Sequence, residues 1–212
     1  MKELIKHSWF ASPVYITQEK EFLEDCLTNT EPYIFEAKNR VVKETNGNTF
    51  GKSYHSTTLI GNEKFLPIQK RTVDLATTIL KDQQYDLNLY NLYITEMWVQ
   101  EFSEKGGGHH SIHTHWNGHI SAFYFLKCSE NTSVPHFHDP RPGKEMILLP
   151  SINDDGLSDA SSEVYYKPTP GTMMLFNSYL PHSFSIDQGK EPFRFIHFNI
   201  QAFPDELQQK KI

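Results

Sequence analysis

The first part of the chain has the hydrophobic periodicity of amphipathic helices. Side chains suited to a buried helix face recur every three or four positions at Phe65, Ile68, Thr72, Leu75, Ala76 and Ile79. This spacing predicts a helix from about residue 63 to residue 81. A second helix is predicted to begin at Thr17, which is a good N-cap, and to bury Phe22 and Cys26.

After residue 86 the pattern changes to short runs of aromatic and β-branched residues, which predict strands. Turn-forming Gly and Pro residues separate the runs, for example at 106–108 and 168–171. The predicted strands cover residues 87–102, 120–126, 145–149, 163–166, 172–176, 183–186 and 193–201. Short strands of this kind favour a mainly β sandwich or barrel with helices packed outside. Two polar stretches, 129–144 and 151–162, are long enough to be binding loops.

The length and composition fit one folded domain. The chain has 212 residues, of which 13% are aromatic and 22% charged, and this excludes wholesale disorder. We expect a single domain over residues 1–212, with a helical part at about 1–85 and a β core at about 86–203. The net charge of −6 argues against a sequence-independent grip on nucleic acid.

Neither a secretory signal nor a membrane span is predicted. The lysines near the N-terminus are not followed by an apolar core of about 7 to 15 residues, and no run of about 18 apolar residues occurs. Cys26 and Cys128 lie too far apart for a CxxC metal pair. A reduced, cytoplasmic setting is therefore expected, with both thiols in packing positions.

Histidine is concentrated in one stretch of the chain. Seven of the eleven histidines lie between His109 and His138. Within this stretch His113 and His115 are two positions apart, so in a strand both imidazoles point to the same side. Two imidazoles on one side can ligate one transition-metal ion. The same spacing also fits two polar residues beside a glycine-rich turn that bind no metal. The spacing alone therefore does not decide between these two interpretations.

A further histidine and an arginine lie downstream. His182 follows the apolar run 172–176, and Arg194 lies within the later aromatic run. A lone guanidinium is costly to bury unless an anion meets it, and its planar fork suits a carboxylate. His197 is three positions from Arg194, hence on the opposite face of the strand, and is expected to pack.

These residues belong to an ordered set of motifs. The set comprises WFASPVY at 9–15, HTHWNGHISAFY at 113–124, FHDPR at 137–141, the segment from Gly171 to His182, and Arg194. This order resembles the iron(II)- and 2-oxoglutarate-dependent oxygenases, and looks most like a subgroup found in bacteria and phages. The likeness covers most of the chain. The HxH pair alone is weakly specific, whereas the ordered set is strongly so.

The resemblance implies a double-stranded β-helix, or jelly-roll, core with flanking N-terminal helices. It implies that His113, His115 and His182 hold Fe(II), and that Arg194 holds the distal carboxylate of the co-substrate 2-oxoglutarate. Tyr124 is a second candidate for contact with that carboxylate, or else a core tyrosine. The activity implied is that of a dioxygenase, specifically a hydroxylase, that releases succinate and CO2.

The expected ligand set departs from the usual pattern of that superfamily, which is two histidines and one carboxylate. Here the second position of the motif is His115. Either His115 is itself a ligand, or it lies outside the coordination shell. In the second case water or a carboxylate from elsewhere, such as Asp139, completes the shell.

The substrate site has four further candidates, which are Asn117, His119, His138 and Arg141. Arg141 is expected either to meet a substrate anion or to pair with a nearby acid. The polar and aromatic loops fit a small metabolite and a peptide side chain equally well.

Two other functions fit the same motifs. One is a three-histidine cupin-type metalloenzyme that needs no 2-oxoglutarate, and the other is a non-catalytic jelly-roll binding protein. Arg194 favours the oxygenase over the cupin-type enzyme, which does not need an arginine that holds a carboxylate, whereas the binding protein would bind neither metal nor 2-oxoglutarate.

Overall fold

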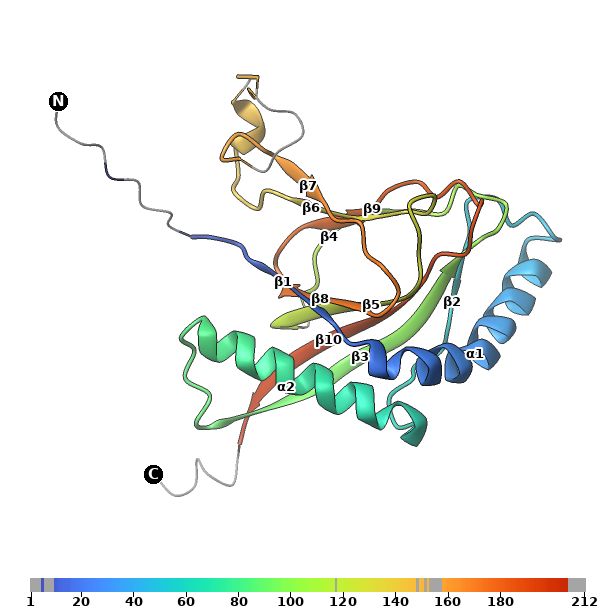
Figure 1. Ribbon diagram of the computed structural model, residues 1–212, viewed down its shortest axis with the longest axis horizontal. Helices are drawn as coiled ribbons and strands as arrows, with labels where there is room; N and C mark the ends of the chain where they lie inside the picture. Colours follow the sequence, from blue (N-terminus) through green and yellow to red (C-terminus); the bar gives the residue numbers. More distant parts are fainter. Residues whose placement is uncertain are drawn as a thin grey trace.

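The strands form two antiparallel sheets that lie face to face (Figure 1). The computed structural model describes Ile5 and residues 10–116, 118–147, 149–150, 152 and 158–205. The six-stranded sheet has the order β1 (Val14–Gln18), β8 (Thr172–Asn177), β5 (Ile120–Lys127), β10 (Arg194–Pro204), β3 (Tyr90–Phe102) and β2 (Ser53–His55). The four-stranded sheet has the order β4 (His110–His113), β9 (His182–Phe184), β6 (Pro135–His138) and β7 (Glu163–Tyr165). This is the predicted mainly β, double-stranded β-helix core.

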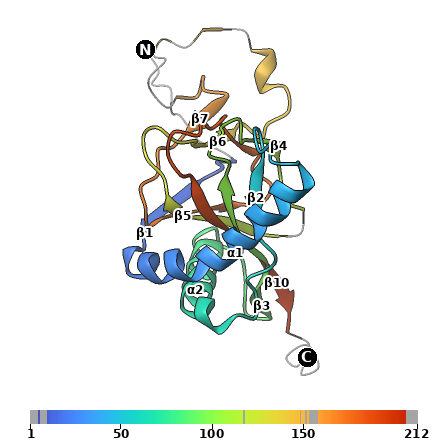
Figure 2. The same cartoon turned by 90° about the vertical axis from the view of Figure 1, so that its right-hand side faces the viewer.

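Two helices cover the outer face of the six-stranded sheet (Figures 1 and 2). They are α1 (Leu23–Glu44) and α2 (Leu66–Asp82), and short 3-10 turns precede each, at Lys20–Phe22 and Glu63–Phe65. In α2 the buried side chains include Ile68, Thr72, Ala76 and Ile79, which is the predicted face. No helix in the described part of the chain is long and apolar enough to cross a membrane.

The six-stranded sheet separates two hydrophobic cores, because successive side chains of a strand point to opposite faces. Along β10, Ile196, Phe198 and Ile200 belong to the core beneath the helices. Phe193 and Phe195 belong to a second core inside the barrel. The second core is mostly aromatic and consists of Phe102, Phe123, Phe125, Phe137, Met174, Phe176, Leu180, Phe184, Phe193 and Phe195.

Several short elements differ from the sequence-based expectation. Thr17 lies in β1 and is not a helix cap, and β2 also falls in the part expected to be helical. The predicted strand 145–149 is wrong at its start, where a 3-10 turn covers Lys144–Met146. The strands β4 and β6 were not predicted, since their polar sequences HSIH and PHFH carry no strand pattern. β9 lies between β4 and β6 and pairs with each of them, and this pairing makes them strands.

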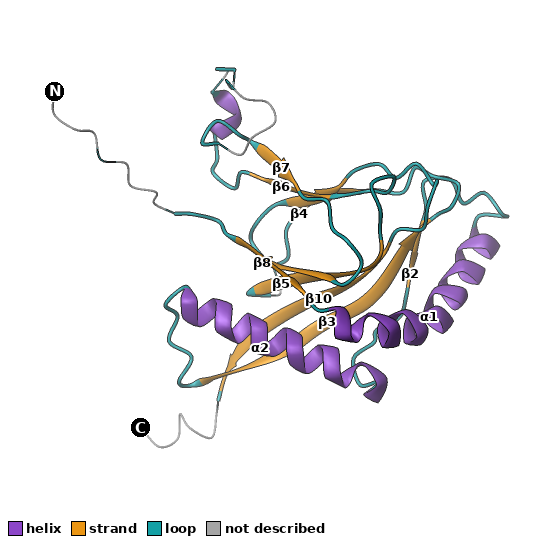
Figure 3. Ribbon diagram, in the orientation of Figure 1, coloured by secondary structure: helices purple, strands orange, loops and turns teal. Residues whose placement is uncertain are grey.

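Close backbone contact joins the connection after β3 to the connection after β9 (Figure 3). Gly107 N donates to Asp187 O at 2.8 Å, and Asp187 N donates to Gly108 O at 2.8 Å. Gly189 has φ +69°, and a Cβ there would lie 2.6 Å from Glu104 O. Only glycine fits such a conformation at such a distance. The contact fixes the start of β4, and so the strand that carries His113.

We predict that Gly189→Ala destabilises the protein more than Gly47→Ala. Gly47 has a similar φ of +84°, but a Cβ added at this position would have no atom within 4 Å, so it reports the conformational strain alone, about 1–2 kcal/mol. The clash at residue 189 should add about 1–3 kcal/mol. Urea unfolding of both variants measures the difference, and equal losses would contradict the close contact.

Candidate metal centre

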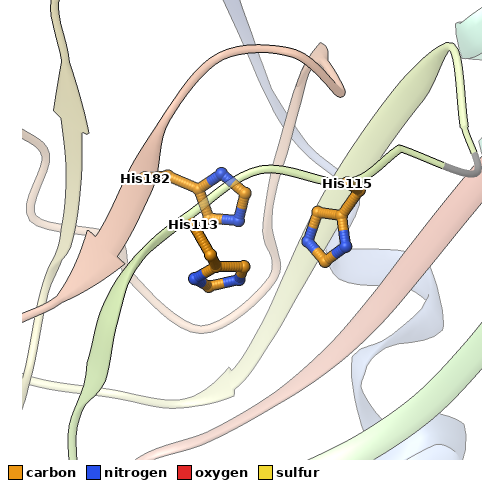
Figure 4. A group of neighbouring side chains, drawn as sticks. All are labelled: His113, His115 and His182. Atoms are coloured by element: carbon orange, nitrogen blue, oxygen red, sulfur yellow. The ribbon is translucent and has the colours of Figure 1, made fainter.

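Three histidines converge between the two sheets (Figure 4). His113 ends β4 and lies directly opposite His182 of β9 in the strand register. His115 follows two residues after His113, and its ring centroid lies 5.1 Å from each of the other two rings. One ligand nitrogen from each residue lies within 4.8 Å of the others. Three imidazole nitrogens this close together would be able to hold one transition-metal ion.

Hydrogen bonds set the tautomers of two of these rings. His182 Nδ1 lies 2.9 Å from Leu180 O, and His113 Nδ1 lies 2.7 Å from Ser111 O. Because a carbonyl oxygen only accepts, Nδ1 carries the proton in each ring and Nε2 keeps its lone pair. This backbone support is typical of metal-ligating histidines.

The ring nitrogens that face this space lack protein partners. Nε2 of His115 and Nε2 of His182 are buried without a hydrogen bond. Burial and the neighbouring imidazoles lower the pKa of His182 to about 3 and that of His115 to about 4. Both rings are therefore neutral at pH 7, which is the form that ligates a metal. Buried polar atoms without partners are rare unless something binds them, so the residues fit a transition-metal ion.

A polar cluster that was not predicted from the sequence lies on the other side of His115. Asn199 Oδ1 accepts from Ser121 at 2.7 Å, and Asn199 Nδ2 donates to Glu96 Oε2 at 2.7 Å. The same Nδ2 lies 3.3 Å from His115 Nδ1. Glu96 and Asn199 face each other across β3 and β10. The alternation along β10, which puts Asn199 on the same face as His197, was the only sequence signal for this cluster.

His197 also lies inside the barrel, beside these residues. Its ring is fully buried, stacks on Trp98 with centroids 4.6 Å apart, and lies 4.7 Å from the His115 ring. Neither ring nitrogen of His197 has a hydrogen-bond partner. His197 does pack, as expected, but it packs against the histidine cluster and brings two unpaired polar atoms to it.

Arg194 does not face the histidines, and the prediction that it holds a carboxylate of 2-oxoglutarate is wrong for this geometry. Its side chain is 2% exposed and lies on the helix side of the sheet. Nε donates to Glu101 at 2.7 Å, and Nη1 donates to Glu31 of α1 at 2.9 Å. The anions that meet this arginine are therefore protein carboxylates. The reason is alternation, since Arg194 and His197 lie on opposite faces of β10.

Tyr124 lies on the same helix side and is likewise not part of the centre. Its side chain is fully buried, and its hydroxyl donates to the backbone oxygen of Glu19 at 2.7 Å. Burial raises the pKa of this hydroxyl. The interpretation of Tyr124 as a hydrogen-bonded core tyrosine is the one that fits.

The barrel interior behind the histidines is filled with aromatic rings. Phe184 and Phe195 stack with centroids 4.7 Å apart, and Phe123 lies edge-on to His182 at 5.5 Å. These three phenylalanines are at most 3% exposed. The centre therefore has an apolar floor, and an apolar environment strengthens interactions between an ion and its ligands.

The substrate-site candidates divide between two places. His119 lines a cavity of about 510 Å3 together with His115, Trp116 and Tyr179. His138 and Arg141 line a second cavity of about 730 Å3. Arg141 Nε there donates to Asp139 at 2.9 Å, and Asp139 is not in the group of close ligand atoms that the three histidines form. Asn117 lies outside the described residues.

The family model described as "Putative 2OG-Fe(II) oxygenase" matches residues 96–199, the span from Glu96 to Asn199 that contains all three histidines. Over this span, close to half of the chain, the sequence matches the 2OG-Fe(II) oxygenase family. Members of the superfamily use Fe(II) and 2-oxoglutarate. At the level of sequence, no curated protein matches the chain.

Solved structures of the oxygenase superfamily share the fold at low identity. AviO1 from Streptomyces viridochromogenes Tue57 is 12% identical with a TM-score of 0.57, over 90% of both chains. A prolyl-4-hydroxylase from Pseudomonas putida is 13% identical with a TM-score of 0.52, over 89% of this chain and 92% of that one. EctD from S. alaskensis, in a complex with 2-oxoglutarate and 5-hydroxyectoine, is 14% identical with a TM-score of 0.57, over 90% and 72%.

We predict that Arg194→Met lowers the stability of the fold and leaves 2-oxoglutarate binding unchanged. Glu101, 5% exposed, would lose its guanidinium and keep Lys38 at 3.1 Å, which should cost about 1–3 kcal/mol. Lys127→Met is the control, because Lys127 also approaches Glu31 and Glu101 but is one-third exposed; it should cost at most about 1 kcal/mol. Denaturant unfolding measures both. Unchanged stability with lost 2-oxoglutarate binding would restore Arg194 as its anchor.

Proposed function

We propose that the chain is an Fe(II)- and 2-oxoglutarate-dependent oxygenase that hydroxylates a C–H bond of an organic substrate. His113, His115 and His182 hold the iron in this proposal. The observation that supports it best is the convergence of three imidazoles, two of which have buried Nε2 atoms without a protein partner. The match to the oxygenase family supports the choice of metal and co-substrate.

The residues of the chain provide binding, orientation and exclusion of water. When bound, iron with its co-substrate supplies the oxidising chemistry. Leu180 O and Ser111 O hold His182 and His113 in the ligating tautomer. The aromatic floor that includes Phe123 keeps water from below the centre. His113 is only half-buried, so the open side of the centre lies next to it.

Substrate is proposed to bind in the cavity next to His115. This cavity of about 510 Å3 is also lined by Tyr85, Tyr90, Trp116 and Tyr179. Aromatic faces and hydroxyls suit a small metabolite or the side chain of a peptide. Neither Arg194 nor Tyr124 fits a role at the co-substrate, so no step is assigned to them.

We predict that His182→Ala abolishes tight binding of Zn(II), an ion that the three-histidine set suits. His182 is fully buried in the centre, so no other side chain replaces it, and the loss should exceed about 100-fold. His136→Ala is the control, because His136 lies on neighbouring β6 and pairs with Glu163. Calorimetric titration of metal-free protein measures both variants. Wild-type affinity in His182→Ala would place the ion elsewhere.

We predict that 2-oxoglutarate added to the iron-loaded protein without oxygen gives the weak visible absorption band of its iron chelate. Tyr124→Phe should keep the band, since the Tyr124 hydroxyl binds Glu19 O on the other side of the sheet. His182→Ala should lose it. Bound iron with no band at any 2-oxoglutarate concentration would contradict the proposal and support the three-histidine metalloenzyme that needs no co-substrate.

A further inference from the structure

His197 is a buried polar residue in surroundings that suit an apolar side chain. Its side chain is 0% exposed, and neither ring nitrogen has a hydrogen-bond partner. Leaving such a group unsatisfied costs about 1–3 kcal/mol. The preceding inward positions of the same run, Phe193 and Phe195, show that this face accepts a purely apolar ring. An imidazole at 197 is therefore explained best by something that binds its nitrogen.

A carboxylate lies next to this imidazole on the neighbouring strand. Glu96 of β3 is opposite Asn199 of β10, and His197 is opposite Trp98, so the side chains of Glu96 and His197 share the barrel face. Asn199 Nδ2 donates to Glu96 Oε2 at 2.7 Å and so orients the carboxylate. Asn199 is itself fixed by Ser121. This is the second-layer support that ligating carboxylates usually have.

His115 completes a second ligand set with these two residues. Ligand atoms of Glu96, His115 and His197 all lie within 4.8 Å of one another, as do those of His113, His115 and His182. A neutral imidazole has one nitrogen with a lone pair. His115 therefore serves one of the two sets at a time.

We propose that Glu96, His115 and His197 form a second position for a divalent cation, which alternates with the three-histidine position. The two sets differ in chemistry. Two imidazoles and a carboxylate suit ions that favour oxygen, such as Mn(II), whereas three imidazoles suit Zn(II). A carboxylate ligand also offsets part of an ion's charge, which imidazole ligands do not. The proposal rests on the proposed function only in that both place an ion at His115.

The test is metal binding by three variants of the full chain. Mn(II) and Zn(II) are titrated separately into metal-free wild type, Glu96→Gln, His197→Phe and His113→Ala. Phe at 197 keeps the ring that stacks on Trp98, so the variant is expected to fold. Glu96→Gln and His197→Phe should weaken Mn(II) binding at least about tenfold and leave Zn(II) affinity within about threefold of wild type. His113→Ala should weaken Zn(II) binding at least about tenfold and leave Mn(II) affinity within about threefold of wild type.

Crystals soaked with each ion give an independent measurement. Anomalous scattering is expected to place Mn(II) beside Glu96 and His197, and Zn(II) beside His113 and His182. Both ions at the three-histidine position, or wild-type Mn(II) affinity in Glu96→Gln and His197→Phe, would overturn the second position and leave the proposed function standing. If His113→Ala and His182→Ala both kept wild-type affinity for both ions, this would instead count against the proposed function.

Discussion

The alternation of side chains along β10 determines what each face of the six-stranded sheet can do. This strand runs through the middle of the sheet, between β5 and β3. One face meets the helices and buries Ile196, Phe198 and the paired guanidinium of Arg194. The other face carries His197 and Asn199 into the barrel beside His115. A shift by one residue would exchange the two sets.

The charged groups of the molecule are distributed according to the same constraint. The buried guanidinium of Arg194 is satisfied by Glu101 and Glu31 on the helix side. On the barrel side, the described polar groups around His115 are imidazoles, the Asn199 amide and one carboxylate, that of Glu96. A cation in this space would meet imidazole lone pairs and one carboxylate, with an aromatic floor beneath it. The structure therefore provides the electrostatic complement of a metal ion, while its buried arginine belongs to a separate ion-pair cluster.

Much of the fold could be predicted because long elements carry their own signal. The face of α2 follows from the spacing of Ile68, Thr72 and Ala76. The central strands β5, β8 and β10 follow from short runs of apolar and aromatic residues, which are typical of strands buried on both faces. The short strands β4 and β6 could not be predicted, because polar residues form them only through pairing with β9. The local sequence of a segment does not indicate which distant strand will pair with it.

By itself, the sequence determined the family, the three histidines that meet, and the fact that Arg194 and His197 face opposite ways. Motif order and period-two alternation are properties of the chain, so they can be read without a structure. Only the tertiary structure decided which face of β10 lines the barrel, and so that Arg194 pairs with Glu31 while His197 meets His115. It also brought Glu96 to the centre. These contacts depend on register between distant strands, and register is set by the packing of the whole sheet.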